Sequence, residues 1–399
     1  MSPRRRSTSS KTSIALVSLI ILIIFGIYNF ISGKGPADTF PKATTPPDSP
    51  ATIVTTSDDA PTAANASGEW WEVYFTDPQN INNPQDWQGS IEGRLIEKID
   101  SARTSIHIAS FEFDLTPVAE ALISAKQRGV DVRWVTDDEN GLVADDEPGR
   151  GQFAMLQEAG IEVRSDDRSA LMHNKFWIFD RQTVWTGSTN ITESGIFKQD
   201  NNTLVIQSPA LAAVYENEFQ EMWNGQFGPK SPSQKDQQTL VVNGSPVQVV
   251  FTSEDKAIEE SIIPVVNSAS QSIRFLAFSF TDFPLASAMI QRAQNGVDVA
   301  GVFEKVGSDT DAAELKTLYC AQIPVRRDGN SAFMHNKVIV VDQRYVITGS
   351  LNFSTNAEDN NDENVIIIDN PDIARLYIQD FDRLWSQASD PEPEKFPCS

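Results

Sequence analysis

Apolar and polar residues divide the chain into a basic arm, a long apolar run, a polar segment and two similar halves. Residues 1–12 carry Arg4, Arg5 and Arg6, and residues 13–32 are almost unbroken apolar. A bilayer is spanned by about 20 such residues, and positive flanks stay on the cytoplasmic side. The pattern predicts a transmembrane helix at 13–32 with a cytoplasmic N-terminus and an extracytoplasmic catalytic body. A cleaved signal peptide is the alternative, but no clear small-x-small cleavage site follows the run.

Residues 33–68 are rich in Pro, Thr, Ser and Ala without periodicity, which predicts a flexible linker. Beyond it, apolar strand-like segments alternate with amphipathic helical ones. Residues 105–113 and 130–135 are typical of buried strands, and residues 118–127 between them have helical spacing. This β-α-β rhythm predicts a largely parallel sheet with helices packed against it.

The same order of segments then occurs a second time. Residues 272–280 resemble residues 105–113, and the helical segment 373–385 resembles 210–223. A whole-domain repeat of this kind predicts two similar units that build one site. We expect a first half at 69–228, a linker at 229–245, a second half at 246–389 and a C-terminal tail at 390–399.

Each half contains one copy of a short polar motif on a predicted strand. Two of the three histidines in the chain occupy matching places in these copies. Side chains two apart on a strand share a face, so each His and the following Lys point the same way. A Gly-Ser-x-Asn segment follows each copy on the returning strand. The motif residues are His173, Lys175, Asp180, Ser188 and Asn190 in the first half, and His335, Lys337, Asp342, Ser350 and Asn352 in the second.

This set of side chains suits phosphodiester chemistry. An imidazole can act as nucleophile or as general acid and base near neutral pH. Lysine and asparagine supply positive charge and donors for phosphate oxygens. With one His attacking phosphorus and the other protonating the leaving oxygen, the displacement needs no metal. The sequence contains no His or Cys cluster with metal-ligand spacing, so we expect neither a metal nor a cofactor.

The motifs resemble the phospholipase D superfamily, whose signature is His-x-Lys-x4-Asp followed by Gly-Ser-x-Asn. The resemblance covers roughly residues 70–388 and implies an α/β fold with two pseudo-symmetric halves, mixed sheets flanked by helices, and one active site at their interface. It implies a two-step mechanism with one His as nucleophile and the other as acid, then base. It assigns catalysis to His173, His335, Lys175 and Lys337, and phosphate binding or support to Asn190, Asn352, Ser188, Ser350, Asp180 and Asp342.

The family also has a downstream acidic residue that orients a histidine. In the second half this is Glu363, whereas Asn201 occupies the matching place in the first half. A carboxylate raises the basicity of its imidazole, whereas an amide only positions it, so we expect His335 to be the more basic of the two. Family precedent then makes His173 the nucleophile and leaves His335 as the acid and base.

The formal net charge of −23 disfavours nucleic acid as a partner, because an acidic surface repels polyanions. We therefore expect a membrane-anchored phosphodiesterase that hydrolyses phospholipids. An extracytoplasmic endonuclease and a phosphatidyl transferase of the cardiolipin synthase type are the alternatives within the superfamily. A binding module without catalytic turnover is a fourth possible function, but the intact motifs in both halves argue against it.

Three remaining features receive structural interpretations. The third histidine, His107, lacks a matching lysine and is expected to be structural. The acidic segment 137–151 matches no cation-binding loop and is expected to be solvated. Cys320 and Cys398 are either paired or free, because their spacing does not decide between these states.

Overall fold

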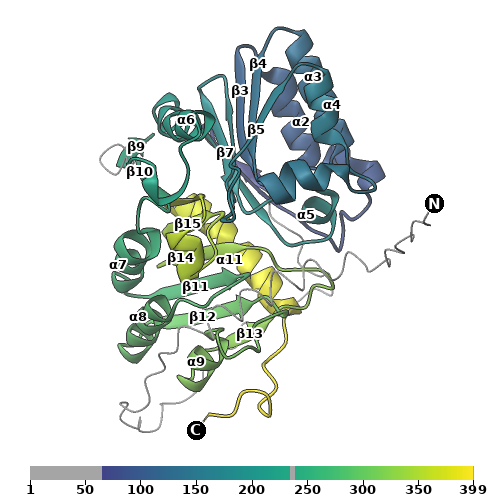
Figure 1. Ribbon diagram of the computed structural model, residues 1–399. Coiled ribbons are helices and arrows are strands. Elements are labelled where there is room, and N and C mark those ends of the chain that lie inside the picture. The colour runs from purple at the N-terminus through teal and green to yellow at the C-terminus, as the bar shows by residue number, and fades with distance from the viewer. Residues whose placement is uncertain (1–64, 234–238, 399) are drawn as a thin grey trace, which may run out of the picture. The chain divides into compact units, whose positions relative to one another are not determined.

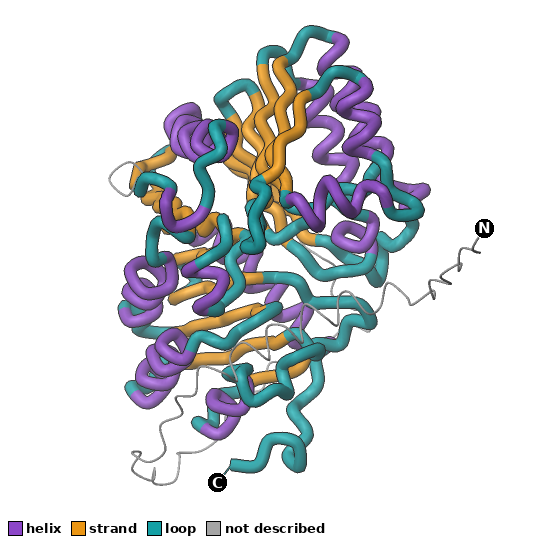
Figure 2. Tube along the Cα trace, in the orientation of Figure 1, coloured by secondary structure: helices purple, strands orange, loops and turns teal. Residues whose placement is uncertain are grey.

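The computed structural model describes residues 65–233 and 239–398, all of them within one compact unit, Ala60–Ser399. Its framework is two mixed sheets of eight strands each, flanked by helices (Figures 1 and 2). The predicted α/β fold with two similar halves is therefore confirmed. The first sheet contains β1 (Ala66–Ser67), β2 (Trp71–Phe75), β3 (Ser105–Ser110), β4 (Asp131–Thr136), β5 (Glu162–Ser165), β6 (Lys175–Phe179), β7 (Thr183–Gly187) and β8 (Asn202–Gln207).

The second sheet repeats the first in composition and order. Read from one edge, the strands run β5-β4-β3-β6-β7-β8-β2-β1 in the first sheet and β13-β12-β11-β14-β15-β16-β10-β9 in the second. The second sheet contains β9 (Thr239–Val242), β10 (Ser245–Thr252), β11 (Ser272–Ala277), β12 (Asp298–Phe303), β13 (Val325–Arg327), β14 (Lys337–Val341), β15 (Tyr345–Gly349) and β16 (Glu363–Asp369).

The expectation of a largely parallel sheet was wrong. In the first sheet only the β3–β4 and β4–β5 pairs are parallel, and the other pairs are antiparallel. The β-α-β rhythm describes only the segment from β3 to β5, whereas the motif strands are joined by tight hairpins. Hairpin connections produce antiparallel pairs.

Helices cover both faces of each sheet. Ten helices and several shorter turns lie among the described residues: α2 (Ile91–Ser101), α3 (Thr116–Gln127), α4 (Gln152–Glu158), α5 (Glu193–Phe197), α6 (Pro209–Trp223), α7 (Ile263–Asn267), α8 (Phe283–Gln294), α9 (Leu315–Cys320), α10 (Thr355–Asp359) and α11 (Pro371–Gln387). The long helices α6 and α11 begin alike, with Ser208 or Asn370 capping the first turn and a proline at its first position.

One apolar core is shared by the two halves. Tyr215 of α6 and Tyr377 of α11 pack in it together with strand residues from both sheets. Separate cores lie on the other face of each sheet, under α2, α3 and α4 in the first half and under α7, α8 and α9 in the second. The shared core holds the two sheets as one body, so a site between them has rigid walls.

The motif hairpins β6–β7 and β14–β15 turn at the motif aspartates. Asp180 and Arg181 have φ of 53°, and Asp342 and Gln343 have φ of 52° and 53°, as the two central residues of a type I′ turn require. The carboxylate of Asp180 accepts the main-chain N–H groups of Arg103, Thr104 and Ser105 at 2.6–3.1 Å. The turn is thereby tied to the start of β3.

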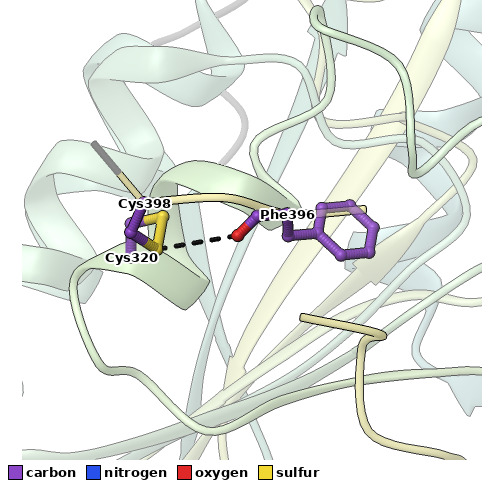
Figure 3. The surroundings of a disulfide bond; sticks show 3 residues. All are labelled: Cys320, Phe396 and Cys398. Carbon is purple, nitrogen blue, oxygen red and sulfur yellow. Dashed lines mark hydrogen bonds between the residues drawn. A yellow bond between two sulfur atoms is a disulfide. The ribbon is translucent and has the colours of Figure 1, made fainter. Parts of the chain in front are cut away.

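The observed elements differ from the expected boundaries at two places. β9 lies inside the predicted linker 229–245 and pairs with β10, so it belongs to the second sheet. Residues of the predicted tail 390–399 pack on the second half: Phe396 is buried, and Glu392 forms an ion pair with Arg327. A disulfide joins Cys320 to Cys398 (Figure 3), which answers the question that the sequence left open.

No helix within the described ranges has the length and apolar character needed to cross a bilayer. The predicted transmembrane helix at 13–32, the arm before it and nearly all of the linker after it lie outside those ranges.

Removal of the disulfide is expected to destabilise the fold. It closes a loop with a sequence separation of 78 residues, and a cross-link of this kind restricts the unfolded chain. We expect Cys398→Ser to lower the free energy of unfolding by about 2–4 kcal/mol in urea titrations. Reductant should lower the free energy of unfolding of the wild type to that of the variant, and it should leave the value of the variant unchanged. Equal midpoints without reductant would contradict this expectation.

Candidate active site

The two motifs meet because each one pairs with the main chain of the other half. Met172 forms a parallel bridge with Asp362, and Asp200 forms one with Met334. His173 N donates to Asp362 O at 2.9 Å, and His335 N donates to Asp200 O at 2.8 Å. The charges of both lysines act on each imidazole, and that of His173 acts on His335. The structure thus brings the predicted His and Lys residues into one site at the interface.

This pairing reverses one assignment made from the sequence. Nδ1 of His173 lies 2.7 Å from Oε2 of Glu363, and Nδ1 of His335 lies 2.9 Å from Oδ1 of Asn201. The orienting groups therefore cross between halves, and the prediction that Glu363 makes His335 the more basic imidazole was wrong. The reason is the pair of bridges, which place residue 363 beside residue 173 and residue 201 beside residue 335.

The motif serines hold the orienting groups of their own halves. Ser188 Oγ donates to Asn201 Oδ1 at 2.8 Å, and the Ser350 hydroxyl bonds to the Glu363 carboxylate. Each preceding glycine is required by close packing. A Cβ on Gly187, at φ +143°, would lie 2.3 Å from the carbonyl oxygen of Asn202. A Cβ on Gly349 would clash in the same way with the carbonyl oxygen of Asn364.

The two lysines are buried beneath the imidazoles. Lys175 is 2% exposed and Lys337 is 1% exposed. Their Nζ atoms donate to the main-chain oxygens of His173 and His335 at 2.8 and 2.7 Å. Burial lowers the pKa of Lys175 to about 8. Burial and the neighbouring Lys175 lower the pKa of Lys337 well below its usual value. The negative charge of a bound phosphate would raise the pKa of both lysines again and so favour their charged forms.

An aromatic ring just after β3 in the first half, and just after β11 in the second, packs on these cations. The Nζ atoms of Lys175 and Lys337 lie 5.0 and 4.6 Å from the ring centres of Phe111 and Phe278. The same rings meet His173 and His335 edge to face. They exclude water from the site and orient the imidazoles.

The motif asparagines Asn190 and Asn352 are placed to hold a ligand. The Oδ1 atom of each is buried and has no hydrogen-bond partner among the described residues. The Nδ2 atom of Asn190 donates to Glu112 at 3.3 Å. A half-turn of an amide exchanges its oxygen and nitrogen, so each position can offer an N–H to a phosphate oxygen.

The middle residue of each motif was missed by the sequence reasoning. Asn364 Nδ2 donates to Asn174 Oδ1 at 2.9 Å, and Asn202 Nδ2 donates to Asn336 Oδ1 at 2.7 Å. Across the interface, the Thr186 hydroxyl donates to Oδ1 of Asn364, and the Thr348 hydroxyl donates to Oδ1 of Asn202. This buried amide network fixes the register of the halves. The signal was the identity of Met-His-Asn-Lys in both copies.

Two buried carboxylates that position the motifs were also missed. Asp137 accepts the N–H of Met172 at 3.2 Å, and Glu304 accepts that of Met334 at 2.7 Å. Each lies just beyond a parallel strand, β4 or β12. The interpretation of segment 137–151 as a solvated loop was therefore wrong for Asp137, which is 1% exposed. Burial raises the pKa of Asp137 and raises that of Glu304 to about 7.

The remaining candidates lie away from the imidazoles. Asp180 and Asp342 stand at the far ends of β6 and β14 from the lysines, where they cap the starts of β3 and β11. Their support is therefore structural. His107 is buried against Glu216, at 2.8 Å, and stacks on Phe219, in agreement with the structural interpretation.

The electrostatics of the site favour neutral imidazoles. Burial, assisted by the lysine charges, lowers the pKa of both histidines well below the usual value. Burial raises the pKa of Glu363 to about 7. With Nδ1 of His173 held by Glu363, Nε2 is the ring nitrogen that can attack an electrophile. An ionised Glu363 stabilises the positive charge that develops on this ring.

Comparisons with known proteins agree with this geometry. Residues 95–223 and 262–385 match the family described as "Cardiolipin synthase, PLD-like domain". The chain therefore belongs to this family, within the phospholipase D superfamily.

Human mitochondrial cardiolipin hydrolase is 35% identical to the chain over 130 residues, 33% of the chain and 52% of that protein. Phospholipase D of Rickettsia conorii is 34% identical over 116 residues, 29% of the chain and 58% of that protein. The chain thus spans about half the length of these relatives. Phosphatidylserine synthase of Haemophilus influenzae matches in structure with a TM-score of 0.57 and 14% identity, over 79% of the chain and 85% of that protein, which supports the fold.

Replacement of the carboxylate partner should weaken catalysis and change its pH dependence. The ionised form of Glu363 exists above its pKa of about 7, so wild-type kcat/KM should fall as pH falls through this value. We expect Glu363→Gln to lower kcat/KM by about 10- to 100-fold at pH 8 and to remove this acidic limb, measured with a chromogenic phosphodiester. Asp369→Asn, at the other end of β16, is the matched control. An unchanged acidic limb in Glu363→Gln would exclude the assigned role.

Proposed function

We propose that the protein hydrolyses phospholipids through a phosphohistidine on His173, with His335 as general acid and then base. The observation that carries the proposal is the unequal pairing of the two rings, His173 with the Glu363 carboxylate and His335 with the Asn201 amide. A carboxylate stabilises the cationic ring of a phosphohistidine, whereas an amide only orients its partner. This favours His173 as the nucleophile.

In the first step, Nε2 of His173 attacks phosphorus and the bond to the leaving oxygen breaks. The leaving oxygen takes a proton from His335. Because Nδ1 of His335 faces the Asn201 amide oxygen, the ring donates its Nδ1 proton to that oxygen. The proton for the leaving group must therefore come from Nε2 of the imidazolium. The negative charge of a bound phosphate favours this protonated form.

In the second step, His335 accepts a proton from water, and the resulting hydroxide oxygen attacks phosphorus. The bond from phosphorus to His173 breaks, which regenerates both rings. Lys175, Lys337 and the asparagines Asn190 and Asn352 bind the equatorial oxygens in both steps. Burial fixes the positions of these four side chains before the substrate arrives, and the bound phosphate favours the charged lysines, so the side chains rearrange little during the reaction.

Phospholipid is the favoured substrate class for two reasons. Relatives of this chain are named cardiolipin hydrolase and phospholipase D, and the net charge of −23 repels a nucleic-acid polyanion. We further propose that residues 13–32 anchor the enzyme in a membrane with the catalytic body on the extracytoplasmic side. An anchor there would hold the site near lipid headgroups.

The roles of the histidines are separable with an aryl phosphodiester, whose leaving group needs no acid. We expect His335→Asn to release about one equivalent of nitrophenolate in a burst and to retain the phosphoryl group on the protein. His173→Asn should show neither effect, because it lacks the nucleophile. His107→Asn replaces the histidine outside the site and should behave as the wild type. A phosphoryl group retained by His173→Asn would contradict the assignment.

Substrate class is decided by parallel assays of the full-length protein in excess chelator. We expect release of phosphatidic acid from phospholipid vesicles, no nicking of plasmid DNA, and loss of lipid turnover in His173→Asn. Ethanol added to the vesicles distinguishes hydrolysis from transfer, since a transferase would form phosphatidylethanol in preference to phosphatidic acid. Nicking of DNA without lipid turnover would establish the nuclease instead.

A further inference from the structure

We propose that Arg168 and Arg383 are positioning residues, each of which orients one of the two active-site histidines. Arg168 holds the main chain that orients His173, and Arg383 holds the main chain that orients His335. Neither arginine belongs to a motif. The inference rests on the proposed function, because it uses the different roles given to the two histidines.

The main chain at Asp362 controls the position of His173 in two ways. The carbonyl oxygen of Asp362 accepts the N–H of His173 at 2.9 Å, and the carboxylate of the next residue, Glu363, lies 2.7 Å from the His173 ring. A rotation of this short segment would therefore disturb both contacts. Any group that fixes the side chain of Asp362 also helps to fix the imidazole.

Arg168, in the loop after β5, fixes the side chain of Asp362. Its Nη2 atom donates to Oδ2 of Asp362, and its Nε atom donates to Asp166 at 3.3 Å. The other oxygen of the Asp362 carboxylate accepts the N–H of Gly228 at 2.7 Å. Burial raises the pKa of Asp362 to about 7, and the Arg168 charge opposes this rise. The arginine thus favours the ionised carboxylate, which accepts both bonds.

Asp200 has the equivalent place beside His335, and Arg383 of α11 holds it. The carbonyl oxygen of Asp200 accepts the N–H of His335 at 2.8 Å, and the next residue, Asn201, orients the ring. The Nη2 atom of Arg383 donates to Oδ1 of Asp200 and to the main-chain oxygen of Thr76, each at 3.2 Å. Arg383 therefore links α11 of the second half to the first-half segment that orients His335.

Arg383 is itself fixed in the interior. Its side chain is 1% exposed, and its Nε atom donates to Asp380 of the same helix at 2.9 Å. The Oδ2 atom of Asp200 accepts Nδ2 of Asn330 at 2.7 Å. A lysine at position 383 would keep the charge, but it would lack the planar fork that bonds to Asp380 and Asp200 together.

The two arginines do not occupy equivalent places in the repeat. Strand register puts Asn330 where the first half has Arg168. Counted from the first residue of each helix, α6 has Glu221 where α11 has Arg383. The repeat therefore does not explain why each aspartate meets an arginine. A cation supplied by different elements to both aspartates is expected if each histidine depends on it.

Two soluble diesters of methyl phosphate distinguish the two roles in the full-length protein. A nitrophenyl ester departs without an acid, whereas a benzyl ester needs a proton from one. We expect Arg383→Lys to lower kcat/KM about 10-fold for the benzyl ester and to leave the value for the nitrophenyl ester nearly unchanged. Arg168→Lys should lower both values about 10-fold, because it displaces the nucleophile.

Two further variants complete the comparison. Asn330→Ala removes the other hydrogen bond to Asp200 and should repeat the pattern of Arg383→Lys. Arg375→Lys replaces an exposed arginine of α11 and should change neither value. Equal losses on both esters in both Arg168→Lys and Arg383→Lys, or no loss in either, overturn the inference. An exchanged pattern keeps each arginine with its histidine and refutes instead the choice of nucleophile in the proposed function.

The ring signals of the histidines in nuclear magnetic resonance spectra test the same pairing without turnover. The chain has three histidines, so the ring signals of the isotope-labelled protein are assignable with the His→Asn variants. We expect Arg168→Lys to shift the signals of His173 and Arg383→Lys to shift those of His335, with His107 as the internal reference. A wild type that hydrolyses neither ester refutes the proposed function, and the signals then judge the inference alone. Shifts of both active-site rings in both variants contradict it.

Discussion

The active site depends on two short main-chain bridges that cross between the halves, Met172 with Asp362 and Asp200 with Met334. Side chains of an extended segment alternate between its faces, so a slip of one residue in either bridge would turn Glu363 or Asn201 away from its imidazole. The buried amides of Asn202 and Asn364 oppose such a slip, because it would leave their donors and acceptors unpaired in the core. Register at the interface and identity of the orienting groups are therefore set by the same contacts.

Catalysis and stability make opposite demands on the buried carboxylates. Burial raises the folded-state pKa of Glu363 and Glu304 to about 7, above the usual value of the unfolded chain. Groups of this kind favour folding at acidic pH, and that contribution is lost as pH rises through about 7. The proposed nucleophile, His173, would however be assisted by ionised Glu363, the form that burial disfavours. The shared core and the cross-half hydrogen bonds offset this cost, and the neighbouring lysine charges lower the pKa of Glu363 in part.

Much of the fold was predictable because local chemistry specifies it. The repeated strands follow from apolar periodicity. Helices α6 and α11 begin where a Ser or Asn cap directly precedes a proline. The motif hairpins follow from polar turn residues. The site was predictable only as a set of residues. Which histidine meets Glu363 depends on contacts 190 residues apart in sequence, and no local pattern encodes them. Asp137 resembled its acidic neighbours in the sequence, yet the strand before it places its carboxylate on Met172 N.

A duplicated scaffold with two equivalent histidines would have no reason to prefer one direction of attack. Here the backbone repeats closely, but the side chains beside the imidazoles differ: a carboxylate reaches His173 and an amide reaches His335. Because a charge and not the backbone breaks the symmetry, one exchange of Glu for Asn on an otherwise equivalent frame is sufficient to make the two imidazoles chemically different.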